Sequence, residues 1–497
     1  MNKRIILIIA VLLVAAGSVF QKSAFPEQQK ELSAPKSQEQ ISKDSPFGAS
    51  FAFSRPFFTD DMSPQEVYQI LSRLEEPYKH VQDVGIKWIR SSDIYWDMVQ
   101  PTQDHIKNNR YEWSLYDNLY GRVPPEINIL GTIICRYGFR PGTWQFVNKE
   151  IEDKYIEFVK KVVKRYGANE KDNMPGLKNR ITYWQVGNEE AVSPDFDWKG
   201  FSHILQITYQ TIKDIDPDAK ILLGGLAAGE RINQNDPVFR QQLENFYFPI
   251  LSNFQGKYFD IFDIHYYGPS GYQQGEIQMG WRGMKNIYDV IRQALDKSGY
   301  KNTEIWFTET AGASTFSERL QAADLVKRFI YPLSLGANKI FWWSMLEGEP
   351  PLEVDRPTNH LGLVYDGIGK DDLGYGVKKL AYYTYKKMVE ILEGSDWNDI
   401  QRVQESDGIY LYRFMRHGKP VWMAWNDNED PRRVRIRLDK NTQNVKITEA
   451  VPKYESGKEV ADYKSAFREV IRRDFLESYP PQLVIEIGNI PVFMEEK

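Results

Sequence analysis

Hydrophobic residues recur along the chain in eight short, nearly continuous runs that are separated by longer stretches with helical spacing. The runs cover residues 47–53, 86–91, 128–134, 182–187, 220–224, 259–265, 304–309 and 339–344. Apolar character on consecutive positions is typical of strands that are covered on both faces, as in a parallel sheet. The pattern therefore predicts eight buried parallel strands.

The stretches between these runs carry apolar residues every three or four positions, which predicts helices. They cover residues 64–84, 150–166, 201–215, 236–254, 283–297, 317–334 and, after the last run, 376–392, with a shorter one around 115–120. A strand followed by a helix, repeated eight times, is the pattern of a (β/α)8 TIM barrel, a fold of the α/β class. We expect this barrel to span residues 46–394.

The pattern changes after residue 395, where polar and apolar residues alternate in short stretches that end in Asn, Asp or Gly turns. Residues 408–414, 420–425, 434–438 and 482–494 carry this alternation. A period of two predicts strands with one buried face, as in an antiparallel sheet. Residues 395–497 are therefore expected to form a small β-sandwich domain, in which residues 463–475 fit either a packed helix or a charged loop.

The N-terminal residues have the pattern of an export signal followed by a linker. Lys3 and Arg4 precede an apolar run at residues 5–20 that ends in small residues. The length of the run fits either a cleaved signal peptide or a retained membrane anchor, and both remain open for residues 1–20. Residues 21–45 are polar and lack periodicity, which predicts a flexible linker. We expect an exported protein that is periplasmic, membrane-anchored or extracellular.

Composition narrows the partners and the chemistry. A net charge of −5 without a long basic tract argues against a nucleic-acid partner. The single cysteine, Cys135, cannot form an internal disulfide and is expected to be an inert buried thiol. The six histidines lie scattered, and the chain has neither a zinc motif nor a glycine-rich phosphate loop. We therefore expect no metal and no cofactor.

Two of the predicted strands run directly into a glutamate. Strand four continues as Trp184-Gln-Val-Gly-Asn-Glu189, and strand seven as Ile305-Trp-Phe-Thr-Glu309. Chemistry in a TIM barrel collects at the carboxyl ends of the strands, so Glu189 and Glu309 can face each other across one pocket. Hydrolysis of a glycosidic bond needs one carboxylic acid to protonate the leaving oxygen and one carboxylate to meet the anomeric carbon. The pair therefore points to a glycoside hydrolase.

The order and placement of these acids resemble the clan A glycoside hydrolases, which carry Asn-Glu after strand four and Glu after strand seven. In its overall sequence pattern the chain is most similar to glycoside hydrolase family 39, with family 5 next. The resemblance covers nearly all of the chain after Pro46. The resemblance implies that Glu189 is the general acid/base and Glu309 the nucleophile of a retaining enzyme. Its substrate would be an O-glycosidic bond in an oligo- or polysaccharide.

The resemblance also implies substrate-binding residues near these acids. Arg90, at the end of strand two, matches an arginine of the clan and would keep Glu309 ionised, whereas a solvated surface arginine is the alternative. Asn188 matches the asparagine that binds the sugar 2-hydroxyl, and a turn-capping asparagine is the alternative. His265 and Tyr267, on strand six, match the clan's His-x-Tyr, with Tyr266 as the substitute if the register is shifted by one.

Tryptophans near the predicted strand ends are candidates for contacts with sugar rings. Trp343, on strand eight, matches the clan's tryptophan beneath the sugar in the cleavage subsite. Successive side chains point to opposite faces of a strand, so Trp342 should then point away. Trp96 and Trp144 fit either stacking on neighbouring sugars or packing within the wall.

One position departs from the family pattern. Many relatives have Asn-Glu-Pro where this chain has Asn188-Glu189-Glu190, which adds a carboxylate beside the predicted acid. If Glu190 points inward, like-charge repulsion raises the proton affinity of the pair and blurs the assignment of roles. We expect it to face outward and to support the loop.

The predicted mechanism makes two further expectations. Arg90 should keep Glu309 charged, while that charge and partial burial should keep Glu189 protonated. The two carboxyl groups should lie roughly 5 to 5.5 Å apart. A non-catalytic polysaccharide-binding or assembly protein of the cell envelope is the alternative function. A metal-dependent barrel hydrolase is a second one, which the missing ligand motifs disfavour.

Overall fold

The structure is a computed structural model, and it describes most of the chain from residue 43 to the C-terminus. The described residues are 43–51, 75–136, 145–168, 173–192, 197–228, 237–253, 256–268, 270–273, 276–347, 357–367, 372–476 and 478–497. The predicted signal or anchor, most of the linker and Trp144 lie outside these ranges. Within them, no helix has the length and apolar character needed to cross a membrane. Residues 38–497 form one compact unit.

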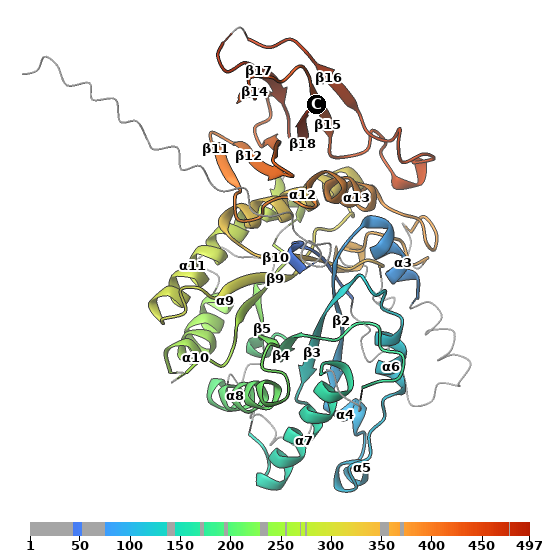
Figure 1. The fold of residues 1–497 in the computed structure, drawn as a ribbon, viewed down its shortest axis with the longest axis vertical. Coiled ribbons are helices and arrows are strands. Elements are labelled where there is room, and N and C mark those ends of the chain that lie inside the picture. Colours follow the sequence, from blue (N-terminus) through green and yellow to red (C-terminus); the bar gives the residue numbers. More distant parts are fainter. Residues whose placement is uncertain are drawn as a thin grey trace, which may run out of the picture. The chain divides into compact units, whose positions relative to one another are not determined.

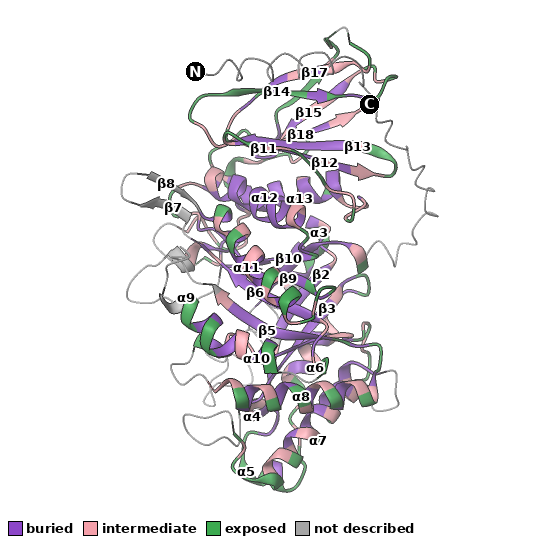
Figure 2. Cartoon of the chain, turned by 90° about the vertical axis from the view of Figure 1, so that its left-hand side faces the viewer, coloured by how far each residue is buried: buried purple, intermediate pink, exposed green. Residues whose placement is uncertain are grey.

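Eight parallel strands close into a barrel, which confirms the predicted fold class (Figure 1). Their order around the barrel is β1-β10-β9-β6-β5-β4-β3-β2. The strands are β1 (Phe47–Ser50), β2 (Trp88–Tyr95), β3 (Asn128–Ile134), β4 (Tyr183–Val186), β5 (Lys220–Ala228), β6 (Ile261–Tyr266), β9 (Glu304–Thr310) and β10 (Lys339–Trp343). Each overlaps one of the predicted apolar runs, and in Figure 2 these strands are drawn largely in the colour of buried residues.

Helices connect the strands along the outside of the barrel (Figure 1). They are α3 (Glu75–Val84), α4 (Trp96–Val99), α5 (Gln103–Lys107), α6 (Ser114–Gly121), α7 (Lys149–Tyr166), α8 (Trp198–Ile215), α9 (Pro237–Gln242), α10 (Phe248–Asn253), α11 (Met284–Lys297), α12 (Glu318–Leu335) and α13 (Leu380–Leu392). Local signals set several ends. Asn148 accepts the backbone N–H of Ile151 at the start of α7, and Gly336, with a φ of 110°, ends α12 in the left-handed conformation.

The single helix predicted over residues 236–254 is interrupted. Between α9 and α10 lies a π-helical segment, Leu243–Tyr247. The Tyr247 hydroxyl donates to the carbonyl oxygens of Gly224 (3.1 Å) and Gly225 (2.9 Å) in the middle of β5. A π segment inserts an extra residue into a turn, which a periodicity of 3.6 does not reveal.

The lower interior of the barrel is filled by an apolar layer. Its members come from different strands and are Trp88, Leu130, Leu222, Ile261, Trp306 and Phe341. Gly48 gives Phe341 its space, because a Cβ at Gly48 would lie 2.5 Å from the Phe341 ring. Side chains at every second position of a strand point into a barrel, so the apolar layer is one level of this alternation.

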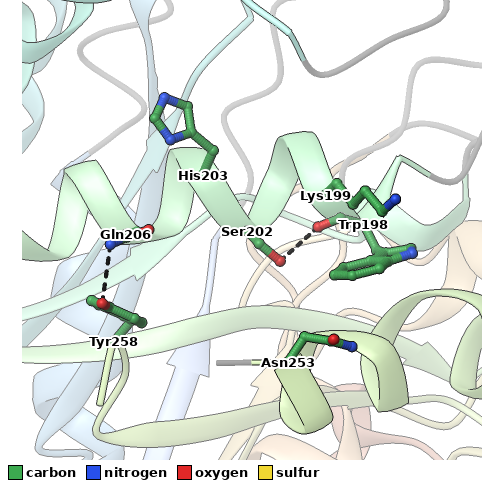
Figure 3. A pocket seen from close by; sticks show the side chains of 7 residues that line it. All are labelled: Trp198, Lys199, Ser202, His203, Gln206, Asn253 and Tyr258. Atoms are coloured by element: carbon green, nitrogen blue, oxygen red, sulfur yellow. Dashed lines mark hydrogen bonds between the residues drawn. The ribbon is translucent and has the colours of Figure 1, made fainter. Parts of the chain in front are cut away.

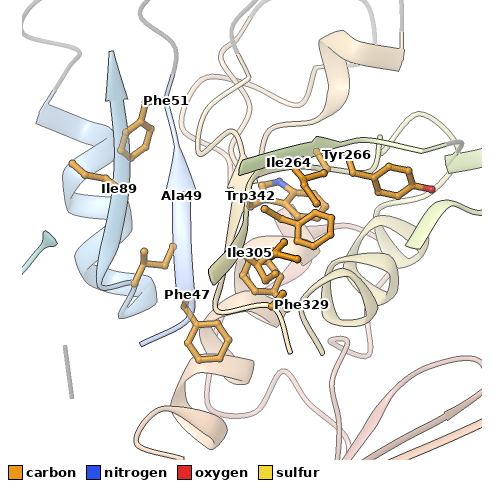
Figure 4. Close-up of a cluster of buried hydrophobic side chains, with 14 of the residues drawn as sticks. Phe47, Ala49, Phe51, Ile89, Ile264, Tyr266, Ile305, Phe329 and Trp342 are labelled. Atoms are coloured by element: carbon orange, nitrogen blue, oxygen red, sulfur yellow. The ribbon is translucent and has the colours of Figure 1, made fainter. Parts of the chain in front are cut away.

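The outward-facing positions of the same strands pack against the helices. Figure 4 shows Phe47, Ala49, Ile305 and Trp342 among the buried side chains of this outer core, together with Phe329 of α12. Helix α12 is buried along nearly its whole length. A strand with apolar residues toward both the interior and the helices reads as a continuous apolar run, which is why the sequence identified these strands.

The C-terminal region consists of antiparallel strands, as predicted for a β-sandwich. A six-stranded sheet has the order β11-β12-β13-β18-β15-β16, and a second sheet pairs β14 with β17. The strands are β11 (Gln401–Ser406), β12 (Ile409–Arg416), β13 (Lys419–Asn426), β14 (Arg432–Arg437), β15 (Val445–Glu449), β16 (Glu469–Arg472), β17 (Gln482–Ile487) and β18 (Val492–Glu496). Residues 463–475 contain the short strand β16 between non-helical segments, so of the two alternatives left open here the packed helix is wrong.

Both faces of the larger sheet are covered. On β13, Trp422 and Ala424 join the core between the two sheets, whereas Met423 and Trp425 join the core of the barrel and its helices. Next to Trp425, the buried Asp427 accepts a hydrogen bond from Lys327 of α12 (3.0 Å). A hairpin of β7 (Ser270–Gln273) and β8 (Glu276–Met279) lies between β6 and α11.

Candidate active site

A polar layer lies above the apolar layer inside the barrel. It consists of Ser50, Arg90, Gln185, Asp263 and Thr308, all of which are buried. Arg90, Asp263 and Thr308 lie two positions after Trp88, Ile261 and Trp306 of the apolar layer. Side chains two positions apart point to the same face of a strand, so the two layers share the interior. The change from apolar to polar coincides with the carboxyl ends of the strands, where barrel chemistry is found.

Irregular pairing at the strand ends directs further side chains into the same space. The register shifts between Arg90 and Asp93 on β2, and between Leu223 and Leu226 on β5. A third shift lies between Phe307 and Glu309 on β9, where Glu309 pairs with His265. A bulge breaks the strict alternation of a strand and can therefore redirect one side chain. It allows Thr308 and Glu309, although consecutive, both to reach the interior groups.

Arg90 binds several of the predicted site residues at once. Its Nη1 donates to Glu309 Oε1 (2.8 Å), its Nε to Gln185 Oε1 (2.8 Å) and its Nη2 to Asn188 Oδ1 (2.7 Å). Asp93 lies 3.4 Å from Nη2. Burial alone would lower the pKa of Arg90, but the surrounding carboxylates raise it above its usual value. Arg90 is therefore a permanently charged, buried partner of Glu309 and not a solvated surface residue.

The loop after β4 carries Asn188 and Glu189 in an unusual backbone conformation. Gly187 has a φ of 77° and Glu189 a φ of 55°. Non-glycine residues rarely adopt this left-handed region. Glu189 keeps 32% of its side-chain surface exposed, whereas Glu309 keeps 7%. Of the two acids, Glu189 is thus the more accessible from outside.

Glu190 does not face outward, so this expectation was wrong. It begins the 3-10 turn Glu190–Val192 and is only 8% exposed. Its Oε1 accepts the backbone N–H of Asn188 (3.0 Å), so it does support the loop, but from inside. A proline, which many relatives carry at this position, could not make this contact because it has no side-chain acceptor.

His265 lies fully buried between the two predicted catalytic acids. Its Nδ1 is 2.8 Å from Glu189 Oε1 and 3.5 Å from Glu309 Oε1. Its Nε2 faces Thr308 Oγ1 (3.0 Å) and Asp263 Oδ2 (3.3 Å). Burial would lower the pKa of His265, but the charges of Glu309 and Asp263 raise it to about 10. With acceptors at both ring nitrogens, the imidazole is held as the cation.

Asp263 and Thr308 orient the imidazole from below. The Thr308 hydroxyl donates to Asp263 Oδ1 (2.7 Å), and the backbone N–H of Gly225 donates to Asp263 Oδ2 (3.2 Å). A Cβ at Gly225 would lie 2.6 Å from the His265 ring, so this close approach requires glycine. No role was predicted for Asp263, Thr308 or Gly225. Asp263 could have been found, because it lies two positions before His265 on the same strand face.

Tyr267 contacts the predicted nucleophile, whereas the role implied for Trp343 stays a prediction. The Tyr267 hydroxyl donates to Glu309 Oε2 (2.5 Å), while the Tyr266 hydroxyl donates to the Gly280 carbonyl (2.6 Å), away from the acids. Trp343 is partly exposed and pairs with Ser50 across β10 and β1. Trp342 is fully buried in the outer core. Tyr267, and not Tyr266, therefore bonds to Glu309, and Trp343 is more exposed than Trp342.

The two predicted catalytic acids come close together although they lie on non-adjacent strands. One carboxylate oxygen of Glu189, one of Glu309 and one ring nitrogen of His265 all lie within 4.8 Å of one another. Neither acid is sealed in the hydrophobic core, since both bond to polar groups of the same cluster. Such a trio could also ligate a metal ion. However, the Arg90 guanidinium already places a positive charge 2.8 Å from Glu309 Oε1, where a divalent cation would be repelled.

The order of proton affinities of the two acids is the reverse of the expected one. Burial raises the pKa of Glu309 above its usual value, against the opposing charges of His265 and Arg90. Burial would also raise the pKa of Glu189, but the hydrogen bond from His265 and its charge lower it instead. The difference arises because His265 bonds to Glu189, a contact that the sequence could not reveal.

The remaining candidates lie apart from this cluster or outside the described ranges. Trp96 is fully buried, its Nε1 donates to Gln100 Oε1 (2.8 Å) and its ring stacks on Phe158, so it packs within the wall. Cys135 is buried as expected. A depression of about 410 Å³ lies beside α8 and α10 and is lined by Trp198 and Tyr258 among others (Figure 3). None of the predicted site residues lines it.

Comparisons with known proteins point to one architecture. No protein family matches the sequence, and no curated protein does so either. Solved structures match well, however. A family 39 glycoside hydrolase from Bacteroides cellulosilyticus aligns with a TM-score of 0.61 at 15% identity, over 92% of this chain and 82% of that protein. A family 39 enzyme from Xanthomonas axonopodis aligns with a TM-score of 0.53 at 15% identity, over 92% and 95% of the two chains.

A third similar structure is a monomeric β-xylosidase from Caulobacter crescentus. It aligns with a TM-score of 0.53 at 15% identity, over 91% of this chain and 96% of the enzyme. The chain shares the fold of these proteins. Since the likeness extends through the C-terminal region as well as the barrel, it covers both parts of the predicted architecture.

Proposed function

We propose that the protein is a retaining glycoside hydrolase that cleaves O-glycosidic bonds in an oligo- or polysaccharide. The observation that carries this proposal is the convergence of Glu189 and Glu309, whose nearest oxygen atoms lie within 4.8 Å. Retaining enzymes hold their two carboxyl groups roughly 5 to 5.5 Å apart, whereas inverting enzymes need a wider gap for a water molecule. The short separation therefore supports retention.

In the first step, Glu309 attacks the anomeric carbon and the bond to the leaving oxygen breaks. The electron pair of that bond passes to the leaving oxygen, which takes a proton from Glu189. Arg90 and Tyr267 each bond to one oxygen of Glu309 and so fix the orientation of its carboxylate. Arg90 donates to Asn188 Oδ1, and we expect Asn188 to bind a hydroxyl of the same sugar.

The proton that Glu189 delivers is held on His265 before substrate binds. This follows from the lowered pKa of Glu189 and the raised pKa of His265, which lie 2.8 Å apart. The proton moves from His265 Nδ1 to Glu189 as the leaving oxygen takes up negative charge. The protons of such a pair are shared, so kinetic pKa values belong to the pair and not to one residue.

In the second step, Glu189 acts as a base. It removes a proton from a water molecule, whose oxygen attacks the anomeric carbon and breaks the ester bond to Glu309. The sugar is released with its original configuration, and the proton returns to His265. Two displacements on the same carbon restore the stereochemistry, so the product configuration tests the mechanism.

The first experiment is a survey of aryl glycosides and polysaccharides with the purified protein. The survey begins with xylosides and glucosides, because the similar structures include the β-xylosidase named above and a glucosidase from Croceicoccus marinus. Cleavage that is lost in Glu309→Gln and insensitive to a chelator supports the proposal. Binding of polysaccharide without cleavage would favour the alternative of an envelope-binding protein, and loss of activity with chelator would favour a metal enzyme.

The roles of the two acids are separated by rescue with azide. In Glu189→Ala, an aryl glycoside with a good leaving group still glycosylates Glu309, and azide then yields a glycosyl azide of retained configuration. In Glu309→Ala, azide replaces the nucleophile and yields the inverted product. We expect this assignment despite the raised pKa of Glu309 and the lowered pKa of Glu189. Exchanged products between the two variants would reverse the roles.

We also propose that the protein is exported through residues 1–20. The charged start and the apolar run support this location, although they lie outside the described residues. Expression of the full chain and of a chain starting at residue 21, followed by fractionation, tests it. A full chain that stays in the cytoplasm would contradict export.

A further inference from the structure

The residue next to the proposed acid has a placement that the glycosidase chemistry does not by itself require. Glu190 is buried, although nothing in a two-carboxylate mechanism calls for a third acid. Its side chain turns back beneath the loop, and Oε1 accepts the backbone N–H of Asn188 (3.0 Å). This carboxylate therefore contacts the backbone that carries both Asn188 and Glu189.

The loop is built around this carboxylate. A Cβ at Gly187 would lie 2.8 Å from Glu190 Cγ and 2.9 Å from its Oε1, so Gly187 is required for the carboxylate to fit. Glu189 has a φ of 55°, a conformation that costs an ordinary residue free energy and persists only where neighbouring contacts hold it. The N–H of Asn188, one residue earlier, is fixed by Glu190.

The side chains that leave this backbone reach both halves of the site. Asn188 Oδ1 accepts from Arg90 (2.7 Å), which in turn binds Glu309. Glu189 Oε1 lies 2.8 Å from His265 Nδ1. A change in the loop of a few tenths of an ångström would alter both contacts, and misplacement of reacting groups lowers rates steeply.

We propose that Glu190 is a positioning residue, which holds Asn188 and Glu189 in the geometry that proton transfer to the leaving oxygen requires. This inference rests on the proposed function of Glu189 as the acid. Glu190 itself touches no substrate. It acts through the backbone N–H of Asn188 and through its charge beside Glu189.

The charge of Glu190 changes near neutral pH. Burial raises its pKa to about 7, with smaller contributions from the Asn188 N–H, Arg136, Asp93 and Glu189. The other titratable groups that face it are the neutral side chains Cys135, Tyr155 and Tyr247. When Glu190 is ionised, it repels the ionised form of Glu189. The pKa of the proton shared by Glu189 and His265 is then higher, so the pair loses this proton only at a higher pH.

Two variants separate the contact from the charge. Glu190→Ala removes both, whereas Glu190→Gln keeps an oxygen that can accept the Asn188 N–H and removes only the charge. The matched control is Glu244→Gln, which alters an exposed glutamate on the π-helical segment. The readout is kcat/KM for two glycosides of the same sugar, one with a dinitrophenyl leaving group and one with an unactivated leaving group.

We expect Glu190→Ala to lower kcat/KM roughly 10- to 100-fold for the unactivated substrate and less than about threefold for the dinitrophenyl substrate. A good leaving group needs no proton, so only the acid-dependent reaction should suffer. Glu190→Gln should restore most of the activity at pH 6 and shift the alkaline limb of the pH profile to lower pH. Equal losses on both substrates, or no loss in Glu190→Ala, would overturn the proposal.

A melting experiment tests the placement of Glu190 without any activity. Because the pKa of Glu190 is raised in the folded state, its contribution to stability is complete below about pH 4.5 and is lost as the pH rises through about 7. The melting temperature of Glu190→Gln minus that of the wild type should therefore increase between pH 5 and pH 8. If the difference in melting temperature between Glu190→Gln and the wild type does not change with pH, Glu190 is not a buried group that titrates in this range. If the wild type cleaves no glycoside, the proposed function is refuted but the placement of Glu190 is not.

Discussion

The apolar layer and the polar layer of the barrel interior meet on β2, β6 and β9, where their residues lie two positions apart. The two layers contribute to different properties of the protein. On β9, Trp306 belongs to the apolar layer and contacts Trp88 with a ring-centre distance of 5.4 Å. Two positions later, Thr308 belongs to the polar layer and bonds to Asp263. The apolar layer excludes water and supports the polar layer, which can then hold charged groups in fixed positions. The comparison separates residues that should control stability from residues that should control chemistry.

The largest expected effect follows from changing the acid that adjoins the polar layer. Glu309→Gln should lower kcat/KM on the order of 10⁴-fold or more, because the nucleophile is lost, while the fold persists. The matched control is Glu304→Gln, at the exposed start of the same strand, which should keep its activity. Activity is measured with an aryl glycoside and folding by circular dichroism. A Glu309→Gln variant with nearly full activity would contradict the account.

A large residue of the apolar layer should show the opposite behaviour. Trp306→Ala leaves a cavity among Trp88, Tyr183 and Phe341, and it should lower the free energy of unfolding by about 3–5 kcal/mol. The folded fraction should keep its kcat/KM within a few fold at low temperature. Denaturant unfolding gives the first quantity and kinetics at 15 °C the second. Trp306→Phe, which fills part of the space, should lose less stability.

Lys339 allows a titration experiment at the lower end of the apolar layer. Its Nζ donates to the carbonyl oxygens of Lys43 (2.6 Å) and Ser45 (3.0 Å) and lies 4.3 Å from the centre of the Trp88 ring. Burial lowers the pKa of Lys339 to about 7. The unfolded chain therefore binds more protons between pH 7 and about 10.5, and stability should rise with pH in this range.

The matched variant for this titration is Lys339→Met, which has no group to titrate. The difference in unfolding free energy, wild type minus variant, should increase by about 2 kcal/mol between pH 7 and pH 9. This sign is opposite to the one expected for Glu190. Parallel curves for wild type and variant would mean that the Lys339 ammonium is not destabilised by its surroundings.

The smallest effect is expected for a hydroxyl of the polar layer. Thr308→Val removes the hydrogen bond to Asp263 Oδ1 and the acceptor at His265 Nε2, and it should cost about 1–2 kcal/mol of stability. It should also lower kcat, because the imidazole loses part of its orientation. Thr308→Ser keeps the hydroxyl and should restore both. A valine variant with unchanged stability and kcat would show that Asp263 alone holds His265.

Much of this architecture could be predicted from the sequence because it depends on local patterns. The barrel strands are covered on both faces, so each appears as an apolar run, and the side chains two positions beyond the apolar layer fall at the strand ends. Arg90, Glu189 and His265 could be predicted from their places at strand ends together with the resemblance. Alternation allows only one of Trp342 and Trp343 to face the pocket, and the resemblance selected Trp343.

The remaining features depend on contacts between distant parts of the chain. The register shift at Glu309 depends on how β9 pairs with β6 and β10. The sequence of residues 304–309 alone does not indicate this pairing. The inward position of Glu190 depends on the space left by Gly187. The order of proton affinities depends on the distance from His265 to Glu189. Period and spacing carry no information on these contacts.

The most direct test of the central claim is to trap the covalent intermediate. A fluorinated glycoside with a good leaving group, of the sugar that the survey identifies, should form the glycosyl-enzyme quickly and hydrolyse it slowly. Mass spectrometry of the digested protein should then find one added sugar on the peptide that contains Glu309, and none in Glu309→Gln. A label on the peptide that contains Glu189, or turnover with inverted product and no label, would contradict the account.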